Sequence, residues 1–118
     1  YYLNDYAYLI SERDSSTYEE LEFALSLAEK AIELEPNNFM IMDTLGWIHF
    51  QMGNLIEAMQ YLEKSIINGG ENSIILEHLG DVYFKMGKIK KAKDIFSKAV
   101  ALNPNNKKLK EKLEPLND

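Results

Sequence analysis

A nine-residue stretch, LGWIHFQMG at residues 45–53, decides the fold because it returns as LGDVYFKMG at residues 79–87. The two copies lie 34 residues apart at every position, and the register continues beyond them, since Ala58 corresponds to Ala92. A period of this length is typical of stacked repeats, in which each unit buries its apolar face against the next. The sequence therefore predicts an array of helical repeats rather than a single irregular globule.

Two glycines of this stretch, Gly46 and Gly80, predict a close approach between helices. Each falls inside a helical segment, where glycine costs about 1 kcal/mol relative to alanine. Because they recur at the same phase, we expect each to let the second helix of its pair come near. The expected crossing points are Ala58 in one copy and Ala92 in the other.

Apolar residues spaced by three and four positions predict helices along most of the chain. We expect turns at Gly53 and Gly87, and an N-cap at Ser16 or at Thr17. The glycine pair at residues 69–70 is expected to end a helix through a positive φ angle. The expected helices cover residues 1–12, 18–34, 39–52, 55–68 and 107–113, with two more between residues 73 and 106.

Composition limits the chemistry that this chain can perform. Its 118 residues suffice for one domain, and the 46% hydrophobic fraction is ordinary for a soluble protein. There is no cysteine, which excludes disulfides, thiol nucleophiles and thiolate metal sites. No apolar run approaches the roughly 20 residues of a membrane-spanning helix, so we expect no membrane insertion. Because the chain begins with Tyr1 rather than Met, we interpret it as a fragment. We expect the fragment to be soluble, and its sequence does not distinguish a cytoplasmic from a periplasmic location.

The charge of the chain is acidic overall and unevenly distributed. A net charge of −6 and a pI near 4.9 argue against nucleic-acid binding, which needs a basic surface. Residues 1–63 hold 12 acidic and 2 basic side chains, whereas residues 64–118 hold 7 acidic and 11 basic ones. This asymmetry favours head-to-tail association of two copies, or it describes two solvated faces.

These residues resemble the tetratricopeptide repeat (TPR), whose motif combines a Leu-Gly pair, an aromatic residue, a turn glycine, spaced alanines and a closing proline. The last repeat carries Leu79, Gly80, Tyr83, Gly87, Ala92, Phe96, Ala99 and Pro104 at these positions. The preceding repeat departs from the motif at His49, Ser65 and Gly70. The first repeat is degenerate and keeps only the alanines and the proline of its second helix.

The resemblance implies an all-α, right-handed α-α superhelix of three TPR-like helix pairs plus a C-terminal capping helix. Within a single TPR domain, the repeats would span about 1–38, 39–72 and 73–106, and the capping helix about 107–115. The chain also looks like the C-terminal repeats of a longer bacterial TPR protein. Such arrays are non-catalytic scaffolds, so the resemblance implies protein binding rather than enzymatic activity.

The resemblance further implies a concave groove, lined by the first helix of each pair, that receives a peptide or a helix of a partner. A helical wheel assigns residues to that groove. The expected groove residues are Tyr8, Met40, Asp43, Trp47, Phe50, Gln51, Ile74, Glu77, Asp81, Phe84 and Lys85. Aromatic residues are common interface anchors, and acidic neighbours attract basic partners. We therefore expect a partner with apolar anchors and basic groups, and not a C-terminal carboxylate held by basic residues.

Two other interpretations of the aromatic groove residues remain open. They pack against neighbouring helices, or they form a surface through which the chain becomes a homo-oligomer.

The remaining candidate sites are weaker. We interpret His49 as a packed, hydrogen-bonded histidine, because it lies on the core-facing arc. His78 lies close to Glu77 and Asp81 in sequence, but no third ligand and no nucleophile accompany them. The lysines between residues 88 and 98 are interpreted as a solvated face. We expect no catalytic site, no metal site and no cofactor.

Overall fold

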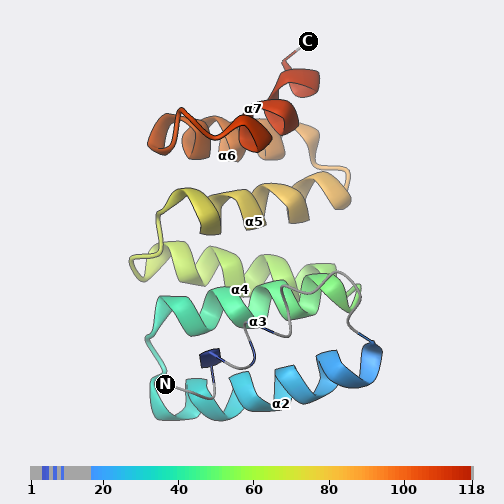
Figure 1. Cartoon of the computed structure of the whole chain (residues 1–118), viewed down its shortest axis with the longest axis vertical. Coiled ribbons are helices and arrows are strands. Elements are labelled where there is room, and N and C mark those ends of the chain that lie inside the picture. The colour runs from blue at the N-terminus through green and yellow to red at the C-terminus, as the bar shows by residue number, and fades with distance from the viewer. Residues whose placement is uncertain (1–3, 6, 8, 10–16, 118) are drawn as a thin grey trace. The chain divides into compact units, whose positions relative to one another are not determined.

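The computed structural model describes residues 4, 5, 7, 9 and 17–117, and this part of the chain contains helices and no strand. Figure 1 shows the helices in chain order from blue to red. The helices are α2 (Tyr18–Leu34), α3 (Phe39–Gln51), α4 (Leu55–Ile67), α5 (Ser73–Lys85), α6 (Ile89–Leu102) and α7 (Lys107–Leu113), followed by the 3-10 turn η1 (Glu114–Leu116). The prediction of an all-α fold is confirmed. The expected N-terminal helix lies largely outside the described residues, although Asn4, Asp5, Ala7 and Leu9 are helical.

The chain divides into two compact units, which are described separately. Unit 1 is Tyr1–Gly70, in which α2 packs on α3 and α3 packs on α4. Unit 2 is Glu71–Asp118, in which α5 packs on α6, and α6 packs on α7 and η1. Each unit therefore contains at least one antiparallel helix pair of the kind that the 34-residue period predicts.

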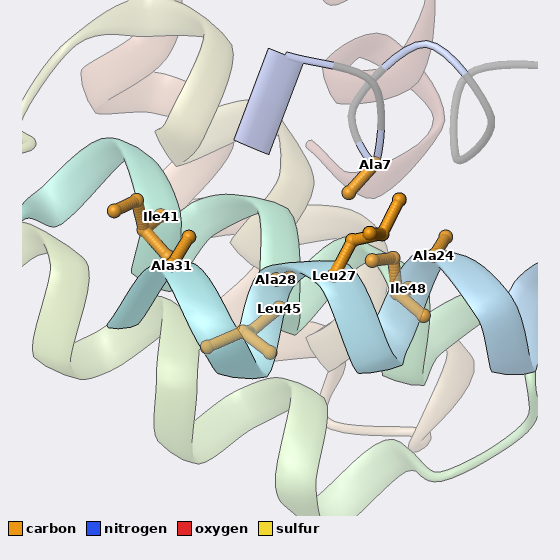
Figure 2. Packing of buried hydrophobic residues seen from close by; sticks show 8 residues of the cluster. All are labelled: Ala7, Ala24, Leu27, Ala28, Ala31, Ile41, Leu45 and Ile48. Atoms are coloured by element: carbon orange, nitrogen blue, oxygen red, sulfur yellow. The ribbon is translucent and has the colours of Figure 1, made fainter. Parts of the chain in front are cut away.

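The core of unit 1 lies where α2 meets α3. Figure 2 shows that α2 contributes mainly alanines and α3 contributes larger aliphatic side chains, with one residue of the N-terminal segment beside them. Small side chains on one helix let the neighbouring backbone approach, so the aliphatic groups of α3 fill the space between the two helices. The cluster consists of Ala7, Ala24, Leu27, Ala28, Ala31, Ile41, Leu45 and Ile48.

The close approach predicted at the repeated glycines is present in both units. A Cβ atom added to Gly46 would lie 2.7 Å from Cγ of Leu62 and 3.2 Å from the carbonyl oxygen of Ala58. A Cβ atom added to Gly80 would lie 2.4–2.8 Å from three ring atoms of Phe96. The expected approach is therefore confirmed, and in both units the side chain that fills the space is four residues beyond the expected alanine.

Asparagines start three of the helices at the same phase of the repeat. The Asn38 side chain accepts a hydrogen bond from the backbone N–H of Ile41 at 3.3 Å, and Asn72 and Asn106 likewise accept from the residue three positions on, at the starts of α5 and α7. Their spacing is the repeat period, so one capping device recurs with each repeat. At α2 the predicted cap at Thr17 is confirmed, because its side chain and that of Glu20 form a reciprocal capping box.

Glycines with positive φ end the helices where the sequence predicts it. Gly53 and Gly87 have φ angles of 85° and 80°, and the residue after each donates its N–H to the helix carbonyl five positions earlier. Gly69 has a φ angle of 107° and ends α4 in the same way. An L-residue disfavours this conformation, so the glycines fix where the chain reverses between helices.

Candidate functional site

Each unit has a candidate binding surface on the first helix of its repeat. We call residues Met40, Asp43, Trp47, Phe50 and Gln51 the α3 face, and residues Ile74, Glu77, Asp81, Phe84 and Lys85 the α5 face. The two faces contain all of the expected groove residues except Tyr8, which lies outside the described residues. Corresponding positions are again 34 residues apart.

An aromatic pair dominates the α3 face. The rings of Trp47 and Phe50 stack with their centroids 4.7 Å apart and their planes inclined by 21°. Both side chains remain partly exposed, and Met40, seven residues before Trp47 on the same helix, is 59% exposed. Gln51 is also partly exposed, whereas Asp43 is only 6% exposed. The accessible part of this face is therefore apolar and aromatic rather than acidic.

An ion pair with the C-terminal helix dominates the α5 face. The Nζ atom of Lys112 lies 2.6 Å from Oε2 of Glu77 and 3.0 Å from Oδ2 of Asp81. The two carboxylates are one helical turn apart on α5, and one ammonium group of α7 joins them. A lysine of the same chain already neutralises part of the charge of these carboxylates, and their attraction for a basic partner stays a prediction.

The partial burial of this ion pair shifts the pKa values of its members. Burial raises the pKa of Asp81 above its ordinary value of 3.8, and the nearby Lys112 offsets this only in part. Burial alone would lower the pKa of Lys112, but its hydrogen bonds to Glu77 and Asp81 outweigh that effect and raise the pKa above 10.5. The ammonium group is therefore held in its charged form.

Sequence reasoning places Lys112 in the expected capping helix and misses its ion pair with α5. A signal for it was present. Leu109 and Lys112 are three residues apart and therefore share one face of α7, and Leu109 is fully buried. Once Leu109 packs inward, Lys112 must lie near neighbouring helices. Glu77 and Asp81, spaced by four on α5, offer matching carboxylates.

A cavity of about 310 Å³ lies beside this ion pair, entirely within unit 2. Its walls come from α5, α6, α7 and η1, and they are mostly apolar. The residues that line it are Asp81, Phe84, Phe96, Glu111, Lys112, Pro115 and Leu116. Phe84 of the α5 face is 53% exposed and forms part of the wall, whereas Ile74 and Lys85 are exposed elsewhere on α5.

The two histidines are packed residues. The His49 ring stacks on Tyr61, with centroids 5.7 Å apart, and the Asn54 side-chain amide donates a hydrogen bond of 3.2 Å to its Nδ1. Burial lowers the pKa of His49, so the neutral ring that accepts this bond is favoured. The interpretation of His49 as a packed, hydrogen-bonded histidine is confirmed. His78 is buried, and the described residues contain no group of three side chains able to hold a metal ion.

The serine that replaces a motif alanine in the second repeat forms a structural hydrogen bond. Ser65 is fully buried, and its Oγ donates to the backbone oxygen of Phe39 at 2.7 Å. This bond joins α4 to the first residue of α3. The departure from the motif at Ser65 therefore replaces a methyl group with an interhelical link.

Among the residues that the structure describes, no helix has the length and the apolar composition of a membrane-spanning segment.

Comparisons with known proteins agree with this arrangement. Models of the tetratricopeptide repeat family match residues 27–60 and 74–106, which together make up more than half of the chain. No curated protein sequence matches the chain. Many solved structures do, and three of them describe the range.

The crystal structure of YrrB, described as a TPR protein with an unusual peptide-binding site, is 27% identical, with a TM-score of 0.82 over 97% of this chain. The crystal structure of MamA is 22% identical, with a TM-score of 0.76 over 83% of this chain. The first TPR of Spaghetti (RPAP3), bound to the HSP90 peptide SRMEEVD, is 16% identical, with a TM-score of 0.78 over 96% of this chain and 91% of its own. This chain spans 56% of the YrrB chain and 57% of the MamA chain.

Proposed function

This chain belongs to the tetratricopeptide repeat family, and we propose that it is a non-catalytic scaffold that binds a peptide or helix of a partner protein on its α3 face. The TPR fold generally serves as a non-enzymatic scaffold. YrrB has a peptide-binding site and the Spaghetti repeat binds an HSP90 peptide, which supports protein binding as the general activity of this chain. We assign the partner to the α3 face for the reasons that follow.

The stacked pair of Trp47 and Phe50 is the observation that carries this proposal. Stacking holds each ring in one orientation, so little conformational entropy remains to be lost when a partner covers them. Tryptophan is among the residues most often found at the energetic centre of protein interfaces. The exposed Met40 extends the apolar surface along the same helix and can adapt to different partner shapes.

The expected partner is amphipathic. An apolar side chain of the partner would cover the aromatic pair, and each Å² of apolar surface buried in this way would contribute about 25 cal/mol to the binding free energy. Polar groups around Gln51 would then form the wetter rim of the contact. A helix that carries apolar residues at spacings of three and four, or an extended peptide with one large apolar side chain, meets this description.

Partner capture followed by mutation tests the proposal. Proteins retained by the immobilised chain would be identified by mass spectrometry, and their affinity would be measured by calorimetry for the variants Trp47→Ala and Phe50→Ala. We expect each variant to weaken binding by roughly tenfold or more, with unchanged helical content by circular dichroism.

Ile56→Ala is the matched control, because Ile56 is an exposed apolar residue on α4, the other helix of the same repeat. It should bind as the wild type does. Normal binding by both aromatic variants would show that the α3 face is the wrong surface.

Self-association is the second candidate function, and the uneven charge of the chain favours it. Residues 1–63 carry a formal charge of −10 and residues 64–118 carry +4. The acidic segment of one copy would attract the basic segment of another, and added salt would weaken the attraction. Light scattering over a range of protein and salt concentrations tests this candidate, and a strict monomer at high protein concentration removes it.

A further inference from the structure

The cavity of unit 2 has the size and lining of a pocket for one large apolar side chain. Phe84 and Phe96 form its aromatic walls, and Pro115 and Leu116 close it from the C-terminal side. Its volume of about 310 Å³ is ample for such a group, since an apolar cavity of about 150 Å³ is enough to bind benzene. Phe96 is fully buried and Phe84 is half exposed, so the walls run from the core of unit 2 out to its surface.

The charged groups beside the cavity favour a cation next to that apolar side chain. Lys112 is already bonded to both Glu77 and Asp81, so its charge is not available to an anionic ligand. Glu111 also lines the cavity, is exposed, and has no ion pair with any residue in the described part of the chain. The cavity and its ion pair thus combine three carboxylates with one ammonium group.

The overall charge of unit 2 acts in the opposite direction, and the positions of its lysines decide which effect dominates. Residues 71–118 hold ten lysines and seven acidic residues, so the unit as a whole is positive. Four of these lysines belong to α7, and Lys107 and Lys108 lie one helical turn before Glu111, but Lys112 is the one lysine among the residues that line the cavity, and it is paired with Glu77 and Asp81. A ligand seated in the cavity contacts Glu111 directly, so the local carboxylate decides its charge preference.

We propose that unit 2 binds a partner segment in which a large apolar side chain adjoins a lysine or arginine, with the apolar side chain in the cavity and the cation on Glu111. This inference deepens the proposed function and rests on its general part, protein binding. It adds a second contact, on a different unit from the α3 face. In this arrangement Lys112 is a positioning residue, because its ion pair holds the C-terminal wall of the cavity against α5.

Three acetylated pentapeptide amides test the proposal by NMR on the ¹⁵N-labelled full chain at physiological salt. The sequences are Gly-Lys-Phe-Lys-Gly, Gly-Glu-Phe-Glu-Gly and Gly-Lys-Ala-Lys-Gly. We expect the first peptide to shift the amide signals of residues around the cavity in a saturable manner, with an affinity in roughly the millimolar range. Replacing phenylalanine with alanine, or the lysines with glutamates, should weaken binding about fivefold or more.

Matched variants locate the peptide. Phe84→Ala removes one wall and should weaken binding about fivefold or more, whereas Ile74→Ala, an equally exposed apolar residue of the same helix, should change it less than about twofold. Glu111→Lys should weaken the lysine peptide by a similar factor and strengthen the glutamate peptide. Glu114→Lys introduces the same charge on an exposed residue that does not line the cavity, and it should have little effect.

Each contrary result overturns the proposal. Equal binding of the alanine peptide would mean that the cavity takes no apolar side chain, and equal binding of the glutamate peptide would remove the preference for a cation. The absence of shifts around the cavity would show that no segment of this chemistry binds there. Trp47→Ala separates the two proposals, because it should release the captured partner and leave pentapeptide binding unchanged. Failure of either result then identifies which surface was assigned wrongly.

Discussion

The helix pair α3–α4 of unit 1 and the helix pair α5–α6 of unit 2 each have a close approach at a glycine, and they differ in the side chains around it. At the approach, Gly46 meets Leu62 in unit 1 and Gly80 meets Phe96 in unit 2, at corresponding positions of the repeat. The side chain at this position is bulkier in unit 2, where Phe96 replaces Leu62. Less space therefore remains for a methyl group at Gly80 than at Gly46. The backbone arrangement is therefore kept while the side chain that fills it changes.

The faces of the first helices diverge much further. Trp47 belongs to a stacked aromatic pair, whereas the corresponding Asp81 is bonded to Lys112 of the C-terminal helix. Unit 1 thus presents an aromatic surface where unit 2 has already bound a segment of its own chain. The packing positions therefore define the repeat, whereas the exposed positions of the same helix can acquire different binding chemistry.

The largest expected effect concerns the close approach at Gly80 in unit 2. Gly80→Ala would force a methyl group into the buried ring of Phe96, and overpacking of this kind costs about 1–3 kcal/mol. The better helix propensity of alanine returns up to about 1 kcal/mol. We expect a net loss of about 1–2 kcal/mol in the free energy of unfolding, measured by urea denaturation followed by circular dichroism.

Gly46→Ala provides the comparison for that loss. Its new methyl group would meet only one side-chain atom closer than 3.0 Å, so we expect a smaller destabilisation. A larger loss for Gly46→Ala than for Gly80→Ala would show that the nearby carbonyl of Ala58, rather than side-chain bulk, limits the approach.

A smaller effect is expected from the Ser65 hydrogen bond of unit 1, for which unit 2 has Ala99 at the corresponding position. Ser65→Ala removes the hydrogen bond to the carbonyl oxygen of Phe39 and should lower the free energy of unfolding by about 1 kcal/mol. Trp47, the single tryptophan, reports the unfolding of unit 1 by fluorescence. Ser97→Ala is the control, since its hydroxyl bonds an exposed carbonyl of its own helix. Equal effects of the two variants would show that the link between α3 and α4 contributes nothing specific.

The ion pair of unit 2 is expected to contribute less still. Lys112→Met should cost about 0.5–1 kcal/mol, because the pair is only partly buried. The raised pKa of Lys112 means that the stabilisation is complete below about 10.5 and is lost as the pH rises through the higher folded-state value. The stability difference between wild type and variant, measured by urea denaturation, should therefore shrink at strongly alkaline pH. A difference that persists there would assign the effect to packing of the lysine stem.

The smallest expected effect is the pH response of His49. Its pKa is lowered from 6.5 by burial, so its stabilisation is present above pH 6.5 and is lost as the pH falls through the folded-state value. His49→Tyr introduces the residue found at the corresponding Tyr83 and removes this titration. Thermal unfolding between pH 7.5 and 5 should show a steeper loss for the wild type than for the variant. Parallel curves would mean that the ring is not desolvated.

The helices and their ends could be predicted because their signals are local and repeated. The glycine turns, the cap at Thr17 and the bounds of α7 all follow from residues within a few positions of each other. The link between Ser65 and Phe39 could not be predicted in this way, because 26 residues separate its members. No periodic pattern marks a contact that occurs in only one repeat.

The candidate sites follow the same division. The helical wheel correctly grouped Trp47 with Phe50, since residues three positions apart on a helix lie on the same side. It could not show that Lys112 crosses to Glu77, 35 residues earlier in sequence, because that contact depends on how α7 packs. Whether these repeats come from a longer bacterial protein stays a prediction.

The short length of α7 has a consequence for the dynamics of unit 2. An isolated helix of seven residues is not stable in water, where about 12–15 residues are needed, so α7 is helical only while it is docked. Leu109 is its one buried residue, and Lys112 adds the ion pair. Undocking of α7 is therefore a local opening that leaves α5 and α6 folded.

Hydrogen exchange would reveal this opening as amides of α7 that exchange much faster than those of α5. Each opening also removes one wall of the cavity, since Lys112 and Leu116 move away together. A ligand in the cavity and the docked C-terminal helix would consequently protect each other from solvent, and slow exchange at α7 would serve as a direct measure of occupancy.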